Sequence, residues 1–353
     1  MRLDGDALDR YARGCAILGA GGGGDVDAPL LQAKSAVAEH GPVEVVDLDE
    51  FPDEGLILPI AGWGAPTVGI EKLGSGREGE TLRSAVERWF GEPIVAIMAG
   101  EIGGGNGVQP VAWAARMSLP LVDADGMGRA FPEGPQVAMH VAGLSPAPVF
   151  LTDEHGNVVT LDPVDGDWYE RLARAVTIAF GGSAIGADFV MTAQVARSAT
   201  IRGTVSLALD LGTAVSKHGI EGLLRSSAGV RIIDGKITDV ERRTTEGFAR
   251  GHALVTGVGS DAGTDVRIHI QNEYLLATVD ERAIAMVPDL IVVLDAAIGD
   301  AVPTELLRYG QRVVVVGIPS APVWRTEAGL AVAGPAAFGF PHRYEAVEDL
   351  ASG

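Results

Sequence analysis

The sequence predicts an α/β N-terminal domain, layered around a mainly parallel sheet, over residues 1–165, and a β-rich, barrel-like C-terminal domain with leading helices over residues 166–353. In the first part, helical patterns alternate with short continuous apolar runs, which is typical of a buried parallel sheet. From residue 230 onward, short strands follow one another and are separated by turns, as in a partly closed barrel. A chain of 353 residues is long enough to bury a core in both domains.

Helices and strands are expected to alternate through the first part. Helical spacing of apolar residues marks residues 5–18, 29–38, 81–90 and 109–117. Short β-rich or continuous apolar runs mark residues 43–48, 56–60, 93–99 and 119–122. Three loops follow such runs, at residues 62–66, 100–107 and 123–129. They are expected at the carboxyl ends of parallel strands, where open α/β sheets bind ligands.

Two helices and then a series of strands are expected in the second part. The helical segments are residues 168–180 and 204–218. The β-rich runs are residues 230–233, 236–242, 253–258, 266–270, 290–294 and 312–318. Between the first two runs, Asp234-Gly235 is a favourable turn pair for a hairpin. The chain has no internal repeat and no low-complexity linker, so we expect the two domains to pack against each other.

The charge of the chain limits the class of partner. A net charge of −20 argues against nucleic acid or an anionic membrane, because a phosphate backbone requires a basic face. A small molecule is the expected partner. The net charge does not exclude an anionic small molecule, since local arginine side chains and backbone amides can bind one. A homo-oligomer is also left open.

The start of the chain and its cysteine usage predict a cytoplasmic protein. Residues 1–6 lack the apolar region of a signal peptide, and no apolar stretch reaches the roughly 18 residues of a membrane span. The single cysteine cannot form an internal disulfide, which suits a reducing compartment. This residue, Cys15, lies on the apolar side of the first helix. A buried inert thiol and a reactive thiol near helix-terminal amides are both open interpretations.

A run of four glycines follows the first predicted helix. Ordering Gly21, Gly22, Gly23 and Gly24 costs backbone entropy, so we expect this loop to approach another group closely or to adopt positive φ. The run resembles a dinucleotide fingerprint, but it follows a helix instead of a strand and has no Walker lysine, so no nucleotide is expected. Two interpretations stay open: a tight turn between helices, or backbone amides that bind substrate together with Asp25.

A second glycine-dense loop, residues 100–107, carries Glu101 and Asn106. At a strand end, Glu101 is a candidate general base or metal ligand, and the alternative is a surface carboxylate that caps a turn. Three successive glycines are hard to explain on a plain surface. We therefore favour a functional loop and expect Gly104 and Asn106 to bind substrate.

Asp123 and Asp125 lie two residues apart and would point the same way from a strand. Such a pair can hold a divalent metal or divide acid and base roles, and the alternative is that it caps the turn at residues 126–128. Arg129 either neutralises the pair or binds a substrate carboxylate. His140 lies in a strand-like run and is either structural or a ligand or proton shuttle. If a metal is used, these two aspartates and this histidine are the expected ligands, with zinc as the first candidate.

A cleft at the domain junction is the expected pocket. In that case Asn272 and Glu273, from a segment that alternates like a half-buried strand, are expected to complete it from the second domain.

Longer motifs cover both halves of the chain. In the first half they are Gly14-Cys-Ala-Ile-Leu-Gly-Ala-Gly-Gly-Gly-Gly-Asp25, Gly64-Ala-Pro-Thr67 with Glu71-Lys72-Leu73, Glu101-Ile-Gly-Gly-Gly-Asn106, and Asp123-Ala-Asp-Gly-Met-Gly-Arg-Ala-Phe-Pro-Glu133. In the second half they are Val240-Glu-Arg-Arg-Thr-Thr-Glu-Gly-Phe248, Gln271-Asn-Glu-Tyr-Leu275, Val287-Pro-Asp-Leu-Ile291 and Leu307-Arg-Tyr-Gly310. Together they resemble the S-methyl-thiohydantoin desulfurase family over nearly the whole chain. The resemblance implies an α/β domain followed by a β-barrel-like domain, and chemistry on thiohydantoin-like five-membered rings linked to hydantoin metabolism.

Two functions of different classes follow from these expectations. In the first, water attacks C2 of a 2-thiohydantoin or its S-methyl form and sulfide or methanethiol leaves. Glu101, Asp123, Asp125 and His140 would then serve as acids, bases or metal ligands, while the glycine-loop amides and Asn106 stabilise the developing negative charge. In the second, the protein is a non-catalytic or regulatory partner of a hydantoin-processing hydrolase. A nucleotide-binding enzyme is motivated by glycine density alone.

Overall fold

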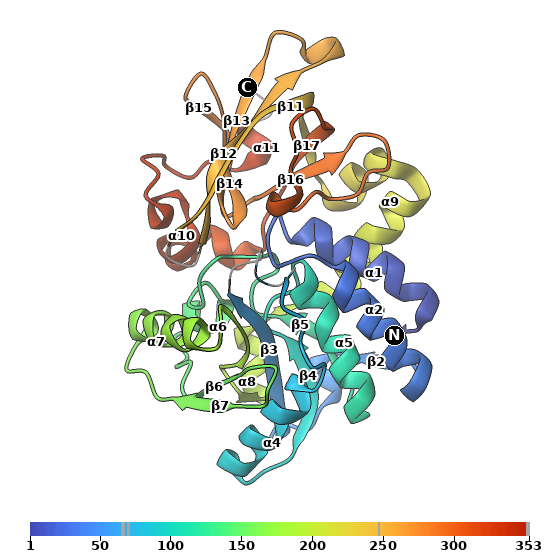
Figure 1. Ribbon diagram of the computed structural model, residues 1–353, viewed down its shortest axis with the longest axis vertical. Helices are drawn as coiled ribbons and strands as arrows, with labels where there is room; N and C mark the ends of the chain where they lie inside the picture. Colours follow the sequence, from blue (N-terminus) through green and yellow to red (C-terminus); the bar gives the residue numbers. More distant parts are fainter. Residues whose placement is uncertain (65–67, 69–70, 246–247, 351–353) are drawn as a thin grey trace.

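The computed structural model describes residues 1–350 except residues 65–67, 69–70 and 246–247. Two sheets organise the chain: the first sheet and most helices fill the lower part of Figure 1, and the second sheet fills the upper part. The predicted fold class is therefore confirmed, as a mixed sheet with parallel strands and helices followed by a curled antiparallel half-barrel. Part of the predicted loop at residues 62–66, and parts of two of the family-like motifs, lie outside the described residues.

The first sheet has ten strands, with the main order β1-β2-β5-β4-β3-β8-β6-β7. The four strands β2, β5, β4 and β3 run parallel, whereas β8, β6 and β7 are antiparallel additions on the far side of β3. Two short strands lie off this path, β9 against β3 and β10 against β5. The strands are β1 (Arg2–Leu3), β2 (Val43–Val46), β3 (Leu56–Gly64), β4 (Ile94–Ala99), β5 (Leu121–Asp125), β6 (Val149–Thr152), β7 (Val158–Leu161), β8 (Ser183–Ala187), β9 (Met191–Thr192) and β10 (Ile201–Arg202).

Strand β3 determines where the sheet opens. Its first half is parallel to β4, with Ile57 opposite Ala96, and its second half is antiparallel to β8, with Ala61 opposite Gly186. Both faces of the first half are buried, because Leu58 belongs to one core and Ile57 to the other. Burial on both faces explains the continuous apolar run in the sequence. Since β3 extends past the end of β4, the loops after β4 and β5 lie beside an exposed strand edge.

Helices cover the first sheet, and α9 joins them from the second half of the sequence (Figure 1). Asp4 caps α1 by accepting a hydrogen bond from the amide of Ala7 at 3.0 Å. A Cβ atom at Gly14 would lie 1.7 Å from the carbonyl oxygen of Ala208, so glycine allows α1 and α9 to pack closely. The helices are α1 (Gly5–Leu18), α2 (Asp27–His40), α4 (Glu78–Phe90), α5 (Gly105–Met117), α6 (Ala138–Val141), α7 (Gly166–Ala179), α8 (Ala193–Ala199) and α9 (Thr204–Ser227).

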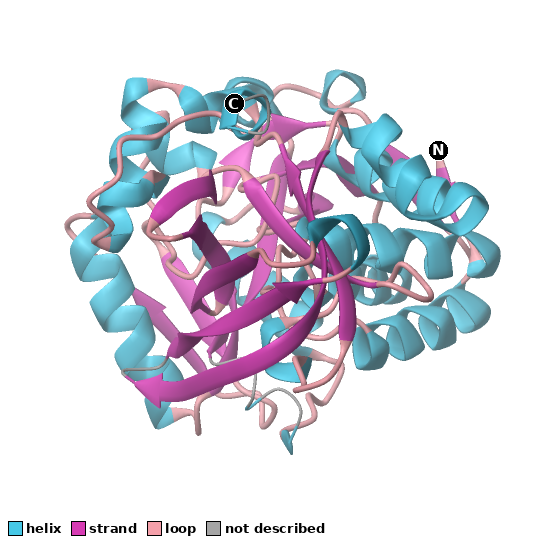
Figure 2. Cartoon of the chain, turned by 90° about the horizontal axis from the view of Figure 1, so that it is seen from above, coloured by secondary structure: helices cyan, strands magenta, loops and turns pink. Residues whose placement is uncertain are grey.

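The second sheet is antiparallel throughout, in the order β15-β14-β13-β12-β11-β17-β16. Seen from above, the strands lie centrally, with helices on both sides (Figure 2). Two helices near the end of the chain, α10 (Glu327–Ala333) and α11 (Val347–Leu350), follow this sheet. The strands are β11 (Val230–Thr245), β12 (Phe248–Gly257), β13 (Asp265–Gln271), β14 (Glu273–Val279), β15 (Arg282–Met286), β16 (Leu290–Asp295) and β17 (Arg312–Ile318).

Two local predictions are wrong. Asp234-Gly235 is no hairpin turn, because β11 runs straight through it and pairs with β12 on one side and β17 on the other. Glycine serves strand packing here, since a Cβ atom at Gly235 would lie 2.5 Å from a methyl group of Val255. The strand-like run around His140 is the short helix α6. Its apolar alternation is too short to distinguish a strand from one helical turn.

The first glycine loop connects the two sheets through its backbone. The carbonyl of Ala20 accepts a hydrogen bond from the amide of Tyr274 in β14, and the carbonyl of Gly21 accepts one from Thr304, both at 2.9 Å. On the other side, the carbonyl of Gly24 accepts a hydrogen bond from the amide of Gly105 at the start of α5, at 2.9 Å. The loop is therefore fixed to both domains.

Close contact explains why these positions are glycine. A Cβ atom at Gly21 would lie 2.4 Å from the ring of Tyr274, and one at Gly23 would lie 2.2 Å from the carbonyl oxygen of Gly103. Gly104 has φ 61° and ψ −150°, a conformation that only glycine adopts readily. The expectation that this loop approaches another group closely and adopts positive φ is confirmed.

Among the described helices, none combines the length and the apolar character needed to cross a membrane.

The substitution Gly104→Ala is expected to lower the free energy of unfolding by about 3 kcal/mol, because it combines an unfavourable backbone conformation with a steric clash. A Cβ atom there would lie 2.6 Å from backbone atoms of Gly23 and Gly24. Denaturant unfolding measures the loss. Gly24→Ala is the matched control: it also has positive φ, but its Cβ atom would meet nothing within 4 Å. It should cost only about 1–2 kcal/mol. Equal losses for both variants would contradict the packing argument.

Candidate functional site

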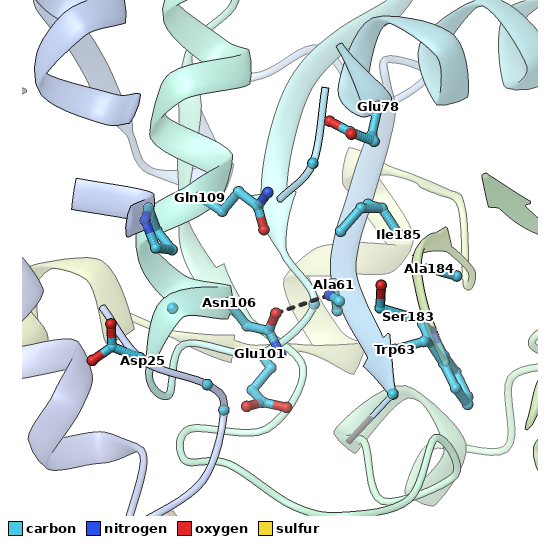
Figure 3. A pocket seen from close by; sticks show the side chains of 18 of the residues that line it. Asp25, Ala61, Trp63, Glu78, Glu101, Asn106, Gln109, Ser183, Ala184 and Ile185 are labelled. Carbon is cyan, nitrogen blue, oxygen red and sulfur yellow. Dashed lines mark hydrogen bonds between the residues drawn. The ribbon is translucent and has the colours of Figure 1, made fainter. Parts of the chain in front are cut away.

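A cavity of about 520 Å³ lies where the two sheets meet (Figure 3). Its walls come from the first glycine loop, the end of β3, the start of α5 and the beginning of β14. Seven residues predicted to form the site line it, which are Gly23, Gly24, Asp25, Glu101, Asn106, Asn272 and Glu273. The tertiary structure thus brings together loops that are about 170 residues apart in the sequence, as the proposed junction cleft requires.

Glu101 lies just after the carboxyl end of β4 and points into the cavity (Figure 3). Its side chain is 5% exposed, and its Oε1 atom has no hydrogen-bond partner. Burial raises the pKa of this carboxyl group well above its usual value, and the charge of Glu273 raises it further. The neighbouring Asn106 amide acts in the opposite direction. Burial and the charge of Glu273 therefore both favour the protonated form of Glu101.

Glu273 is the first residue of β14 and faces the same cavity from the second sheet. It is 2% exposed, and its Oε2 atom has no hydrogen-bond partner. Burial raises the pKa of Glu273 to about 8, while the nearby Arg129 guanidinium favours the ionised form. The side chain lies directly against the first glycine loop, because a Cβ atom at Gly22 would be 2.0 Å from its Oε1 atom.

Arg129 is fully buried and provides positive charge near both glutamates. Its Nη1 atom donates hydrogen bonds to the carbonyls of Pro288 at 2.8 Å and Asp289 at 2.9 Å, and its guanidinium lies 4.6 Å above the ring of Phe131. Burial lowers the pKa of Arg129 to about 10, so the side chain stays cationic at neutral pH. It is not among the residues that line the cavity. This location does not suit the predicted role of binding a substrate carboxylate.

The amides of the second glycine loop hold the loops together. The amide of Ile102 donates to Asp125, that of Gly104 to the carbonyl of Cys15, and those of Gly105 and Asn106 to the first glycine loop. These four amides are therefore already engaged. Gly22 and Gly104, both predicted to bind substrate, take packing positions beside the cavity and do not line it.

Asn106 is fixed at the cavity wall by its side chain. Its Oδ1 atom accepts a hydrogen bond from the amide of Gly62 in β3 at 2.9 Å, shown as the dashed line in Figure 3. This hydrogen bond orients the side-chain oxygen of Asn106 toward β3. The NH2 group of the same side chain therefore lies beside Glu101. Asn106 is therefore placed to donate to a group bound next to Glu101.

Asp125 organises the loops behind the cavity. It is fully buried and accepts hydrogen bonds from the amides of Ile102 at 2.8 Å, Met127 at 3.0 Å and Gly128 at 2.8 Å. Burial raises its pKa to about 6, and these amides oppose that shift. These hydrogen bonds match the turn-capping role, which is one of the roles that the sequence analysis left open for Asp125.

Asp123 joins β5 to α9. Its carboxylate accepts hydrogen bonds from the amide of Ser206 at 3.0 Å and from the Ser206 hydroxyl at 2.5 Å. His140 lies in α6, and neither residue lines the cavity. In the described part of the chain, no group of three or more His, Cys, Asp or Glu side chains is arranged to hold a metal ion. The structure therefore does not bring Asp123, Asp125 and His140 together as a ligand set, and the use of a metal stays a prediction.

Three residues on the opposite wall were missed by the sequence analysis. Tyr169 donates a hydrogen bond from its hydroxyl to Asp188 at 2.5 Å, and its ring packs edge-on against Trp63 with ring centroids 5.3 Å apart. Burial raises the pKa of Asp188 to about 6. All three line the cavity. Trp63 lies in β3, at a position that the sequence analysis assigned to a loop after a strand. No sequence signal predicted β8, which precedes Asp188.

Cys15 is a buried thiol inside α1 and does not line the cavity. Burial raises the pKa of its thiol well above the usual range. Its sulfur lies close to the backbone of α5, since a Cβ atom at Gly107 would be 2.9 Å from Sγ. Of the two interpretations left open, the structure matches a packed, inert cysteine.

Comparison with known proteins agrees with this architecture. A solved structure of a protein from Chromobacterium violaceum superposes with a TM-score of 0.81 at 24% identity, covering 98% of this chain and 100% of the other chain. This likeness shows a shared fold. A search among curated proteins finds no match. Family models described as the S-Me-THD-like N-terminal and C-terminal domains match residues 6–163 and 164–347, respectively. The chain therefore belongs to the S-methyl-thiohydantoin desulfurase-like family.

Proposed function

We propose that the protein is an enzyme that hydrolytically desulfurises a 2-thiohydantoin or S-methyl-thiohydantoin ring to a hydantoin. The supporting observation is the pair of buried carboxyl groups, Glu101 and Glu273, which face one cavity from the two domains and each keep an oxygen without a partner. The family assignment supplies the ring class. Buried carboxyl groups with raised pKa values that share one cavity are typical of acid–base catalysis.

The reaction of the S-methyl form consumes one water molecule. The water oxygen forms a bond to C2, and the bond between C2 and the methylthio sulfur breaks. One water proton ends on the leaving sulfur, which departs as methanethiol, and the other ends on the ring nitrogen. With the 2-thiohydantoin, both protons end on sulfur and hydrogen sulfide leaves.

The two glutamates have different roles in this mechanism. Arg129 is the strongest influence that favours the ionised form of Glu273 but a minor one for Glu101, whose pKa the charge of Glu273 raises in addition to burial. Glu273 is therefore the base that accepts a proton from the attacking water, and Glu101 is the acid that protonates the leaving sulfur. Asn106 donates to the heteroatom that gains negative charge. Because Cys15 is packed away from the cavity, the mechanism uses water as the nucleophile.

Glu273→Gln and Glu101→Gln are each expected to lower kcat at least about 100-fold, because each removes one proton-transfer group. The assay follows the loss of thiocarbonyl absorbance and the release of sulfide or methanethiol. Glu345→Gln, an exposed glutamate that lies outside the cavity, is the matched control and should retain full activity. Full activity of both cavity variants would refute the acid–base assignment. No turnover by the folded wild type on any thiohydantoin would instead favour a regulatory partner of a hydantoin-processing hydrolase.

The pH dependence tests the assignment of the base. Because only ionised Glu273 accepts a proton, kcat/KM should rise with pH as this group loses its proton, with an apparent pKa of about 8. At higher pH, kcat/KM should fall again as Glu101 ionises. Glu273→Gln should abolish the rising limb in whatever activity remains. A wild-type profile that falls through pH 8 would reverse the two roles.

A further inference from the structure

We propose that Trp324, Asp289 and Tyr344 are positioning residues, which hold the buried Arg129 at the place from which its charge acts on Glu273. This inference rests on the proposed function only for the role of Glu273 as the base. It gives a part in the reaction to the C-terminal segment, residues 319–350, none of which lines the cavity.

The contacts that fix Arg129 are with neutral groups. Its Nε atom donates a hydrogen bond to the carbonyl of Ala130 at 2.9 Å, and its Nη1 atom donates to the carbonyls of Pro288 and Asp289. Its guanidinium carbon lies 4.6 Å from the centroid of the Phe131 ring. Its Nη2 atom has no hydrogen-bond partner among the described residues. The place of the charge therefore depends on the Phe131 ring and on the turn at residues 287–289.

Trp324 of the C-terminal segment supports the Phe131 ring. It is fully buried, and its ring packs edge-on against that of Phe131 with ring centroids 4.9 Å apart. Its Nε1 atom donates a hydrogen bond at 2.7 Å to the carbonyl of Met127, which precedes Arg129 by two positions. Helix α10, which follows Trp324, contacts α6 of the first domain (Figure 1). The C-terminal segment is thus anchored on the stretch of chain that carries Arg129.

The carboxylate of Asp289 fixes the turn that supplies the two carbonyls. It is fully buried and accepts hydrogen bonds at 2.9 Å from the amide of Ser320, the hydroxyl of Tyr344 and the amide of Val347. Arg325 donates to the same carboxylate from Nη2 at 2.7 Å. All four residues belong to the C-terminal segment. This segment therefore holds the turn whose carbonyls accept the hydrogen bonds of Arg129.

The charge of Arg129 acts on Glu273 together with the charges of other groups. Arg129 favours the ionised form of Glu273 and, more weakly, that of Glu101. The charge of Glu305 acts in the opposite direction on Glu273. The charges of Glu273 and Asp125 oppose ionisation of Glu101. Because Coulomb attraction falls with distance, a displaced guanidinium would raise the pKa of Glu273. The C-terminal segment therefore helps to set the pH at which the base becomes active.

Two neutral substitutions test this role. Trp324→Phe removes the hydrogen bond to Met127 and reduces the contact between the rings, and Tyr344→Phe removes one hydrogen bond to Asp289. The double variant keeps every charged group, so no shift arises from a lost charge. We expect the apparent pKa of Glu273 to rise by about 0.5 in this variant, and by at least about 1 in Arg129→Met, which removes the charge itself.

Nuclear magnetic resonance reads this titration without turnover. In protein labelled with ¹³C at the glutamate side-chain carboxyl carbon, the chemical shifts report ionisation, and the resonance lost in Glu273→Gln identifies Glu273. Because Glu273 and Glu101 interact, both apparent pKa values of the pair are recorded. In the hydrolysis assay, the rising limb of kcat/KM should move to higher pH by the same amount. The shift in resonance without any turnover would support the positioning role and contradict the desulfurase.

Trp89→Phe with Tyr309→Phe is the matched control, since it makes the same chemical changes at two exposed side chains outside the cavity lining. This control should keep the wild-type titration. An unchanged titration of Glu273 in the folded Trp324→Phe, Tyr344→Phe variant would overturn the inference.

The same two substitutions in the Arg129→Met background separate positioning from a general structural effect. They should raise the pKa of Glu273 no further, because no guanidinium is left to displace. A further rise of equal size would show that the C-terminal segment acts by another route, and it would refute the positioning role. If Arg129→Met does not fold, Tyr344→Phe alone decides. Its effect reaches the site through Asp289, so a rise in the pKa of Glu273 supports the inference and an unchanged value contradicts it.

Discussion

The close packing of the first glycine loop between the two domains is the constraint on which the site depends. Backbone groups of this loop bond to Tyr274 and Thr304 on one side and to Gly105 on the other. Side chains at Gly21 or Gly23 would occupy space that the neighbouring ring and backbone already fill. Only this close approach brings the first residue of β14 within reach of the loop that follows β4. The glycines therefore set the geometry of the site and leave the chemistry to the side chains around them.

That geometry has an electrostatic consequence. It buries Glu101 and Glu273 in one place, with Arg129 as a fixed countercharge, and the pKa values of both carboxyl groups rise because water is excluded. Asp125, fully buried behind them, orients the loop that carries Glu101 through its bond to the amide of Ile102. The same burial leaves one oxygen of each glutamate without a hydrogen-bond partner in the described part of the chain.

The sequence predicted correctly those site residues whose side-chain chemistry and position after an apolar run both pointed to a ligand site. Glu101 and Asn106 follow an apolar run that became β4, so their position at a sheet edge could be derived from strand order alone. Asp123 and Asp125 were chosen by the same rule, but hydrogen bonds to backbone amides and to Ser206 occupy them. A short motif cannot show whether a carboxylate faces a cavity or caps its own turn.

By itself, the sequence determined the α/β and β-rich halves, the two glycine loops and the family, because periodicity, glycine density and long motifs are local properties. The tertiary structure decided what those loops contact. It placed Glu273 in the same cavity as Glu101, and it placed Arg129 outside the cavity lining. It also added Asp188 through β8, a strand that enters the first sheet from the second half of the chain. These outcomes depend on contacts between residues far apart in sequence. Burial, charge pairing and shifts in pKa exist only after such contacts have formed.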